Sequence, residues 1–193
     1  MARTKEFDPD TALRAALELF WERGYEATSM ADLVAHLGVA RASIYATFGS
    51  KRELYLRALD HYGEIVDPLL LRELAQPGPV LPSVRALVRR FAAEAAGPGG
   101  ARGCFVVNTA VELAPHDQSA QQRVAASWDH LEAVLASALI RAQAQGELVP
   151  DRDPRALSRL LLVLMQGIRV VGKVPGGARR LPDAVTQALA LLG

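Results

Sequence analysis

Apolar residues recur three or four positions apart along most of the chain, and short breaks rich in glycine and proline separate these stretches. This spacing is typical of amphipathic α-helices, whereas half-buried strands need strict alternation. The segment at Val106-Val107 could be a buried strand, but its Ala-Val-Glu-Leu continuation favours a helix. The pattern predicts an all-α protein with helices at Asp8-Pro9 to Gly24, Ser29 to Gly38, Ala40 to Thr47, Ser50 onwards, Leu81 to Ala96, Gly103 to Leu113, Asp117 to Gln145, Asp153-Pro154 onwards and Leu181 to Leu192.

The helix that begins at Ser50 is expected to be long. Ser50 and Glu53 have the spacing of a capping box, in which two side chains satisfy free N–H groups of the first turn. We expect Pro68 to bend or end this helix, because proline removes a helical hydrogen bond, and Pro77-Gly78-Pro79 to interrupt it. The helix starts beside the N-terminal helices and ends in the rest of the protein, so it is the expected mechanical connection between them.

The stretch from Thr28 to Lys51 predicts two short helices joined by a tight turn. Ser29 and Asp32 can form a capping box, and Gly38 ends the first of these helices. In the second, Val39, Ile44 and Phe48 would face inward, and Arg41, Ser43, Tyr45 and Thr47 would face outward. Such a pair is a helix-turn-helix, whose second helix enters the DNA major groove. The same spacing also fits two ordinary surface helices with solvated polar groups.

The outward residues have the chemistry for binding DNA. Arg41 can contact a guanine edge or a phosphate, and Ser43 and Thr47 can donate and accept at bases. The hydroxyl of Tyr45 can bond a phosphate oxygen. Lys51 lies at the start of the next helix, where its ammonium and the helix N-terminus can hold one phosphate together.

Positive charge gathers around this stretch although the whole chain is nearly neutral, with a net charge of +1. The first 60 residues contain eight Lys or Arg and nine Asp or Glu. Between Leu37 and Leu59, however, four basic residues accompany a single acid, Glu53. Such a local patch is what phosphate binding needs.

The segment from Ala12 to Leu56 resembles the DNA-binding domain of the TetR family of bacterial transcriptional repressors. The resemblance implies phosphate contacts at Thr28, Tyr45 and Lys51, and operator readout at Arg41, Ser43 and their neighbours. It depends on the fixed spacing of Gly24-Tyr25, Thr28-Ser29, Ala31, Leu33 to Ala35, Leu37-Gly38-Val39, Ser43-Ile44-Tyr45, Phe48 and Ser50-Lys51. The DNA-binding candidates are therefore Thr28, Ser29, Arg41, Ser43, Tyr45, Thr47 and Lys51.

Two positions depart from the family pattern. Thr47 stands where many members carry histidine, and Ala46 is often a larger residue. The bases that are read therefore stay open.

The resemblance further implies a homodimer on a palindromic double-stranded operator, because two recognition helices one DNA turn apart read such a sequence. Family members pair through a four-helix bundle built from the last two helices, which points here to residues 160–168 and 181–192. The apolar surface of these helices is broad, as an interface needs. Alternatively, these helices complete the core of one subunit.

The family also implies a small-molecule inducer bound among the central helices. The residues that could line its pocket are mostly apolar or aromatic, which favours an apolar or amphipathic ligand. Each of them could equally fill the core. They are Tyr62, Phe91, Phe105, Asn108, Glu112, Trp128 and Met165.

Cys104 is a candidate redox-sensing residue. It follows Gly103 at a predicted helix N-terminus, where the helix dipole and Arg102 would stabilise a thiolate. The segment RGCFVVNTAVELAP resembles a branch of the family in which a Gly-Cys pair opens this helix, and some of that branch senses electrophiles or oxidants through the cysteine. In such sensors the region of Lys173 approaches the thiol. Cysteine also packs in cores without reacting.

Other classes of function find little support in the sequence. There is no GxSxG, no HExxH, no phosphate-binding loop and no dinucleotide fingerprint, and the four histidines are scattered. No Cys or His pair has zinc spacing, and a single cysteine precludes an intramolecular disulfide. We therefore expect no enzyme activity, no metal and no cofactor.

A membrane partner is not expected either. No apolar run reaches the roughly 18 to 20 residues needed to span a bilayer, and the N-terminus MARTKEFDPD lacks the apolar core of a signal peptide. Half of the residues are apolar, which disfavours disorder. The reducing cytoplasm is the expected location.

The sequence thus predicts a three-helix helix-turn-helix DNA-binding domain in residues 1–49 and a larger helical ligand-binding and dimerisation domain in residues 50–193. The expected function is a sequence-specific transcriptional regulator, a repressor released from its operator by a small apolar ligand or by thiol modification. The alternative is an all-α interaction or adaptor module without DNA binding, which predicts no sequence preference and no steep salt dependence.

Overall fold

The computed structural model describes residues 7–193, and all regular elements in this range are helical. The helices are α1 (Pro9–Arg23), α2 (Met30–Leu37), α3 (Arg41–Phe48), α4 (Lys51–Leu74), α5 (Leu81–Ala96), α6 (Phe105–Glu112), α7 (Gln118–Ala144), α8 (Pro154–Gly172) and α9 (Leu181–Ala190), with short 3-10 turns η1 (Gly100–Arg102) and η2 (Gly177–Arg180). The all-α prediction is confirmed. The expected lack of a signal peptide concerns a stretch that includes residues 1–6, which lie outside the described residues.

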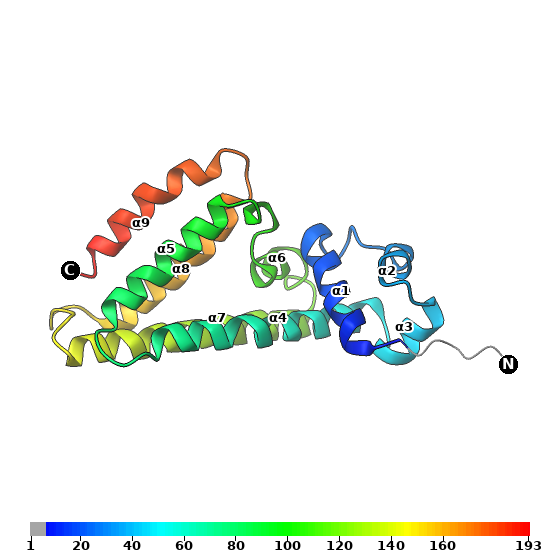
Figure 1. The fold of residues 1–193 in the computed structure, drawn as a ribbon, viewed down its shortest axis with the longest axis horizontal. Helices are drawn as coiled ribbons and strands as arrows, with labels where there is room; N and C mark the ends of the chain where they lie inside the picture. The colour runs from blue at the N-terminus through cyan, green and yellow to red at the C-terminus, as the bar shows by residue number, and fades with distance from the viewer. Residues whose placement is uncertain (1–6) are drawn as a thin grey trace.

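The molecule is elongated, with α1, α2 and α3 at one end and α5, α8 and α9 at the other (Figure 1). α4 and α7 run side by side along its length, and α6 lies in the middle. Within residues 7–193, no helix is both long and apolar enough to cross a membrane.

Local capping chemistry sets the ends of the N-terminal helices. Asp8 caps α1 with its carboxylate, and Ser29 and Asp32 form the predicted capping box at the start of α2. Gly24 and Gly38 end these two helices with φ angles of 88° and 64°, in the region that favours glycine. The sequence prediction of these boundaries is confirmed to within a residue or two.

Of the two expectations for Pro68 in α4, a bend or an end of the helix, the structure excludes the end. The helix continues from Lys51 to Leu74 with Pro68 in its interior, so the proline does not end it. Proline leaves one helical carbonyl without its usual N–H donor, but Pro68 lies on the exposed side of α4, where solvent can satisfy that carbonyl. The chain leaves the helix only before Pro77-Gly78-Pro79.

Two buried clusters form the core. The first joins α1, α2, α3 and the first half of α4 to α6 and the start of α7, and Phe20, Tyr55 and Phe105 lie in it. The second joins the remaining part of α4 to α5, α7, α8 and α9. A domain boundary at residue 49 follows the order of the helices, but α6 and α7 contribute to the same core as α1. The N-terminal helices therefore rest directly on the regulatory half.

α8 and α9 expose less apolar surface than expected over residues 181–192. The apolar stripe of α9, with Val185 and Leu189, is buried in the second cluster of its own chain. On α8, one side is buried and the opposite side exposes several aliphatic residues: Leu160, Val163 and Val170, with Val174 just beyond. An apolar surface available to a partner is thus mainly a property of α8.

Candidate nucleic-acid interface and regulatory pocket

α3 presents a basic and hydroxyl-bearing surface to solvent. Ile44 and Phe48 are buried and fix the helix against the N-terminal core, which turns Arg41 and Tyr45 outward. A guanidinium nitrogen of Arg41 lies 3.5 Å from the Tyr45 hydroxyl, one helical turn away, and Tyr45 is 41% exposed. Ser43 is half-buried on the same short helix. Arg41 and Tyr45 thus lie where the sequence predicted them.

Thr47 lies near a further positive charge. Its side chain is half-buried, and its backbone carbonyl accepts a hydrogen bond of 3.4 Å from the Arg57 guanidinium. Arg57 also lies over the Phe48 ring, with its Cζ 5.8 Å from the ring centroid. The basic patch predicted from sequence therefore includes a residue of α4 behind the end of α3.

Thr28 is placed differently from the expectation. Its residue exposure is 0%, and its hydroxyl donates to the carbonyl of Gly24 at 2.6 Å. The side chain is therefore a structural part of the turn between α1 and α2, with no exposed surface for a phosphate. Ser29 is exposed, but its hydroxyl oxygen accepts from the backbone N–H of Asp32 as the α2 cap.

Lys51 also has a structural role in this structure. Its ammonium donates to the carbonyl oxygens of Tyr25 at 2.7 Å and Thr28 at 2.8 Å, and lies 4.0 Å from the centroid of the Tyr25 ring. These contacts cross-link the α1–α2 turn to the start of α4. Two of the three ammonium N–H groups are thus engaged within the fold, and the phosphate contact of Lys51 stays a prediction.

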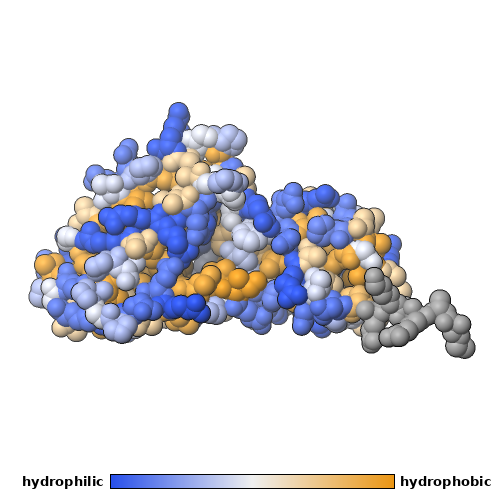
Figure 2. All heavy atoms as spheres, in the orientation of Figure 1, coloured by the Kyte–Doolittle hydropathy of each residue, from blue (hydrophilic) through white to orange (hydrophobic). Residues whose placement is uncertain are grey.

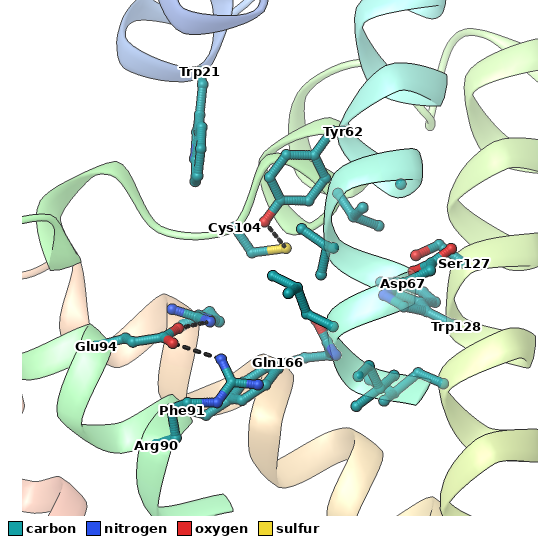
Figure 3. Close-up of a pocket in the computed structure, with 17 residues that line it drawn as sticks. Trp21, Tyr62, Asp67, Arg90, Phe91, Glu94, Cys104, Ser127, Trp128 and Gln166 are labelled. Carbon is teal, nitrogen blue, oxygen red and sulfur yellow. Dashed lines mark hydrogen bonds and ion pairs between the residues drawn. The ribbon is translucent and has the colours of Figure 1, made fainter. Parts of the chain in front are cut away.

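A pocket of about 230 Å³ lies between the two ends of the molecule and draws residues from α1, α4, α5, α7 and α8 and from the start of α6. Figure 2 shows the surface hollowed in this central region, with apolar residues beside the hollow. Of the predicted ligand-binding residues, Tyr62, Phe91 and Trp128 line the pocket, together with Cys104. In Figure 3, Trp128 and Asp67 lie on one side, and Arg90 and Glu94 on another.

A row of paired charges borders the pocket. Glu94 accepts from Arg169 at 2.5 Å and from Arg90 at 2.6 Å, and Arg90 reaches on to Glu73 at 3.1 Å. Burial raises the pKa of the Glu94 carboxyl, but the hydrogen bonds from Arg169 and Arg90 outweigh it and hold the pKa below its ordinary value. The Arg169 guanidinium also lies 4.4 Å from the centroid of the Phe91 ring. Each charge here already has a partner.

Cys104 is the N-cap residue of α6, and its sulfur makes no capping hydrogen bond but lines the pocket (Figure 3). The Tyr62 hydroxyl donates to Sγ at 3.7 Å. Burial is the main cause that raises the pKa of Tyr62 well above its usual range, and the neighbouring thiol raises it further. The phenol therefore keeps its proton at neutral pH.

Lys173 approaches the same helix start without reaching the sulfur. Its ammonium donates to the Asn108 side-chain oxygen at 2.7 Å. Its aliphatic stem packs over Gly103, where a β-carbon would lie 2.7 Å from Lys173 Cδ. A larger residue at position 103 would be strained by the φ of 66° and would displace the Lys173 stem.

Four predicted ligand-binding residues lie elsewhere. Phe105 is fully buried between the Tyr55 and Tyr62 rings, and Met165 is fully buried in the second cluster. Asn108 bonds Lys173 and the Arg102 carbonyl, and Glu112 accepts from the backbone N–H groups of Tyr25 and Glu26 at 3.0 and 2.9 Å. These side chains hold the fold, because buried polar groups find partners within it.

The sequence prediction missed most polar residues of the pocket. Arg90 and Glu94 are one helical turn apart, a pairing that the sequence does show. Trp21 gave no such signal, because it belongs to the first N-terminal helix. The missed pocket residues with polar side-chain atoms are Trp21, Asp67, Arg90, Glu94, Ser127, Gln166 and Arg169. Throughout residues 7–193, no group of three or more His, Cys, Asp or Glu is placed to bind a metal ion.

Comparisons with known proteins agree with this architecture. Residues 12–58 match the family model "Bacterial regulatory proteins, tetR family", and residues 80–188 match "Tetracyclin repressor-like, C-terminal domain". The chain belongs to the TetR family. It is therefore a helix-turn-helix, DNA-binding transcriptional regulator and not an enzyme, as the sequence predicted.

Two curated relatives and a solved structure match over nearly the whole chain. HTH-type transcriptional regulator YezE of Bacillus subtilis (strain 168) is 37% identical over 193 residues, which cover 100% of both chains. HTH-type transcriptional repressor ComR of Escherichia coli (strain K12) is 33% identical, covering 98% of this chain and 90% of that protein. The structure of a cysteine mutant of the TetR family regulator CifR with 26-base-pair double-strand operator DNA has a TM-score of 0.86 and 29% identity, and the match covers 100% of each chain.

Proposed function

We propose that the protein is a homodimeric repressor that binds a palindromic operator through α3 and releases it when the central pocket is occupied. The observation that supports DNA reading most directly is the exposed pair of Arg41 and Tyr45 on α3, which offers a cation and a hydroxyl on one face. Arginine commonly binds guanine edges, and tyrosine commonly binds phosphate. The CifR complex with operator DNA supports this use of the fold.

Dimerisation is proposed to use the exposed side of α8. Val163 is 69% exposed; Leu160 lies three positions before it, Val170 lies seven positions after it, and Val174 lies just beyond the end of α8. Gly167 lies among them with open space around it, so a partner helix can approach closely. Pairing this face with its copy around a two-fold axis removes the apolar groups from water.

A charged side chain on this face tests the dimer. V163E should shift the protein to monomer in sedimentation equilibrium and sharply weaken operator binding. V111E is the matched control, because Val111 is a valine with 74% exposure on α6 and is not part of the exposed side of α8. A dimeric V163E protein would place the interface elsewhere.

The ligand is proposed to be small, uncharged and mostly apolar. The pocket volume of about 230 Å³ is below the roughly 300 to 1,000 Å³ of sites for drug-sized molecules. Aromatic side chains form much of its wall, whereas Arg90 and Arg169 already have carboxylate partners. An additional anion would gain little from guanidinium groups that are neutralised.

Thiol modification is a second proposed input. Cys104 Sγ accepts the Tyr62 hydrogen bond and lines the same pocket, so a group attached to it would occupy that space. Alkylation of Cys104 should therefore release DNA. Unchanged operator affinity in the fully alkylated protein would contradict this.

A binding titration tests whether the protein recognises a DNA sequence. The titration compares DNA from immediately upstream of the protein's own gene with scrambled DNA over a series of salt concentrations. Selective binding that weakens steeply with salt is expected, because basic side chains release counterions from the phosphates. An operator selected from a random duplex library extends the test to distant sites. Failure to enrich any sequence would favour the interaction-module alternative.

A further inference from the structure

One wall of the pocket belongs to the DNA-binding unit itself. Trp21 lies on α1, two residues before the end of that helix, and its ring lines the pocket. Its indole Nε1 donates to the carbonyl of Gly103 at 3.1 Å, across the junction to the start of α6. Figure 3 shows Trp21 reaching from α1 toward Cys104 and Tyr62. A molecule in the pocket therefore lies beside a side chain of the N-terminal unit.

The surroundings of Trp21 make it sensitive to what fills the space at Cys104. Its ring meets the Tyr62 ring edge to face with centroids 5.0 Å apart, and Tyr62 in turn bonds the sulfur of Cys104. The Arg102 guanidinium covers the Trp21 ring at 4.3 Å. Gly103, which accepts the indole hydrogen bond, is the residue directly before Cys104. An occupant next to the sulfur therefore lies beside both Tyr62 and the indole, whose hydrogen-bond acceptor is the neighbouring residue of Cys104.

α6 holds α1 at a second place as well. At the far end of α6, the Glu112 carboxylate accepts from the backbone N–H groups of Tyr25 and Glu26, just after α1 ends. α1 is thus fixed to both ends of α6, through Trp21 and through the turn that leads to α2. Because α1 packs directly on α2, a shift of α1 relative to α6 repositions the helix-turn-helix.

We infer that Trp21 is a positioning residue that carries the state of the pocket directly to the DNA-binding unit. When the space beside Cys104 is filled, the indole loses its contact with Gly103, and α1 moves with it. This connection through α1 is separate from the connection through α4, whose Tyr62 also lines the pocket. The inference rests on the proposed release of DNA by an occupied pocket.

The test needs no knowledge of the natural ligand, because Cys104 is the single cysteine of the chain and lines the pocket. Iodoacetamide is the probe: the thiol sulfur forms a bond to its methylene carbon, iodide leaves, and the thiol proton passes to the buffer. Mass spectrometry verifies one adduct per chain. For each variant we compare the operator Kd of the alkylated protein with that of the unmodified protein. The ratio of the two values reports the coupling between pocket and DNA-binding unit, because differences in basal affinity cancel.

W21F removes the indole N–H and keeps an aromatic ring. W128F is the matched control, because it removes the other pocket indole from α7, outside the DNA-binding unit. Trp128 Nε1 is buried and has no hydrogen-bond partner within residues 7–193, so W128F breaks no bond. R102Q is a second variant, which removes the guanidinium that packs over the Trp21 ring.

Alkylation should raise the operator Kd of the parent protein and of W128F by about 10-fold or more, within the usual range of coupling between sites. W21F should show less than about a third of that ratio, and R102Q an intermediate one. Equal ratios in W21F and the parent would overturn the inference and leave release by the pocket standing. An alkylated parent protein that keeps its operator affinity would instead overturn the release by an occupied pocket, and the inference with it.

Discussion

Two arginine–aromatic pairs show how differently the DNA-binding face and the pocket treat charge. Arg41 lies 5.7 Å from the centroid of the Tyr45 ring on the exposed face of α3, and Arg169 lies 4.4 Å from the centroid of the Phe91 ring at the pocket. Within the described part of the chain, Arg41 has no acidic partner, whereas Arg169 is paired with Glu94. The charge of the Arg41 guanidinium is therefore not neutralised by a carboxylate, and the group is exposed to solvent.

This difference separates the two tasks of the molecule. A solvated cation can exchange water and counterions for a phosphate or a base edge at little desolvation cost. A paired, partly buried cation is neutralised by its carboxylate and offers little to an incoming anion. The same two residue types therefore favour polyanion binding at one end and an uncharged ligand in the middle.

Removing the exposed guanidinium should have the largest effect on DNA binding. R41A should lower operator affinity by about 1 to 3 kcal/mol, or roughly 5- to 150-fold, because a base or phosphate contact is lost. Electrophoretic mobility shift or fluorescence anisotropy titration would measure it. R72A removes the same charge from the exposed far end of α4 and should change affinity little. Equal losses in both variants would mean that only the overall charge matters.

Lys51 tests whether a cation near the DNA-binding face behaves like Arg41 or like Arg169. K51M should destabilise the protein by about 2 kcal/mol, since two charged hydrogen bonds to backbone carbonyls are lost. For a chain of this size, that loss lowers Tm by about 4 to 8 °C, which circular dichroism can follow. An unchanged Tm of K51M, together with a weaker salt dependence of its DNA binding, would instead support the phosphate contact that the sequence predicted.

The smallest effect concerns the paired charges at the pocket. The pKa of Glu94 is lowered in the folded protein from its ordinary value of 4.5, so this carboxylate contributes stability above that value. The contribution is lost as pH falls through the lower folded pKa. As pH is lowered, the free energy of unfolding of E94Q should therefore decrease less than that of the parent protein. Urea unfolding between about pH 3 and pH 7 measures it, and parallel pH curves for E94Q and the parent would contradict the pairing.

Residues with partners nearby in the chain could be predicted from the sequence. Ser29 and Asp32 are three positions apart, so the capping box that starts α2 is visible as a local motif. The apolar spacing and flanking breaks likewise predicted α5 from Leu81 to Ala96 without error. Such elements depend on hydrogen bonds and packing within one or two helical turns.

Residues with distant partners could not be assigned in this way. The carbonyls that bind Lys51 come from 23 and 26 residues earlier, and the N–H groups that bind Glu112 come from 86 and 87 residues away. Both side chains look like free charges in the sequence, and both are committed to the turn after α1. The pocket could not be predicted from the sequence for the same reason, because its lining residues come from six helices or helix starts that are far apart in the chain.

The position of the indoles also gives the protein a built-in optical signal. The chain contains two tryptophans, and both Trp21 and Trp128 line the pocket. Its intrinsic indole emission therefore arises entirely at this site, and its intensity and wavelength will follow the polarity of whatever enters. Candidate inducers can be titrated against unlabelled protein, and the two single phenylalanine variants assign each spectral change to the α1 side or the α7 side.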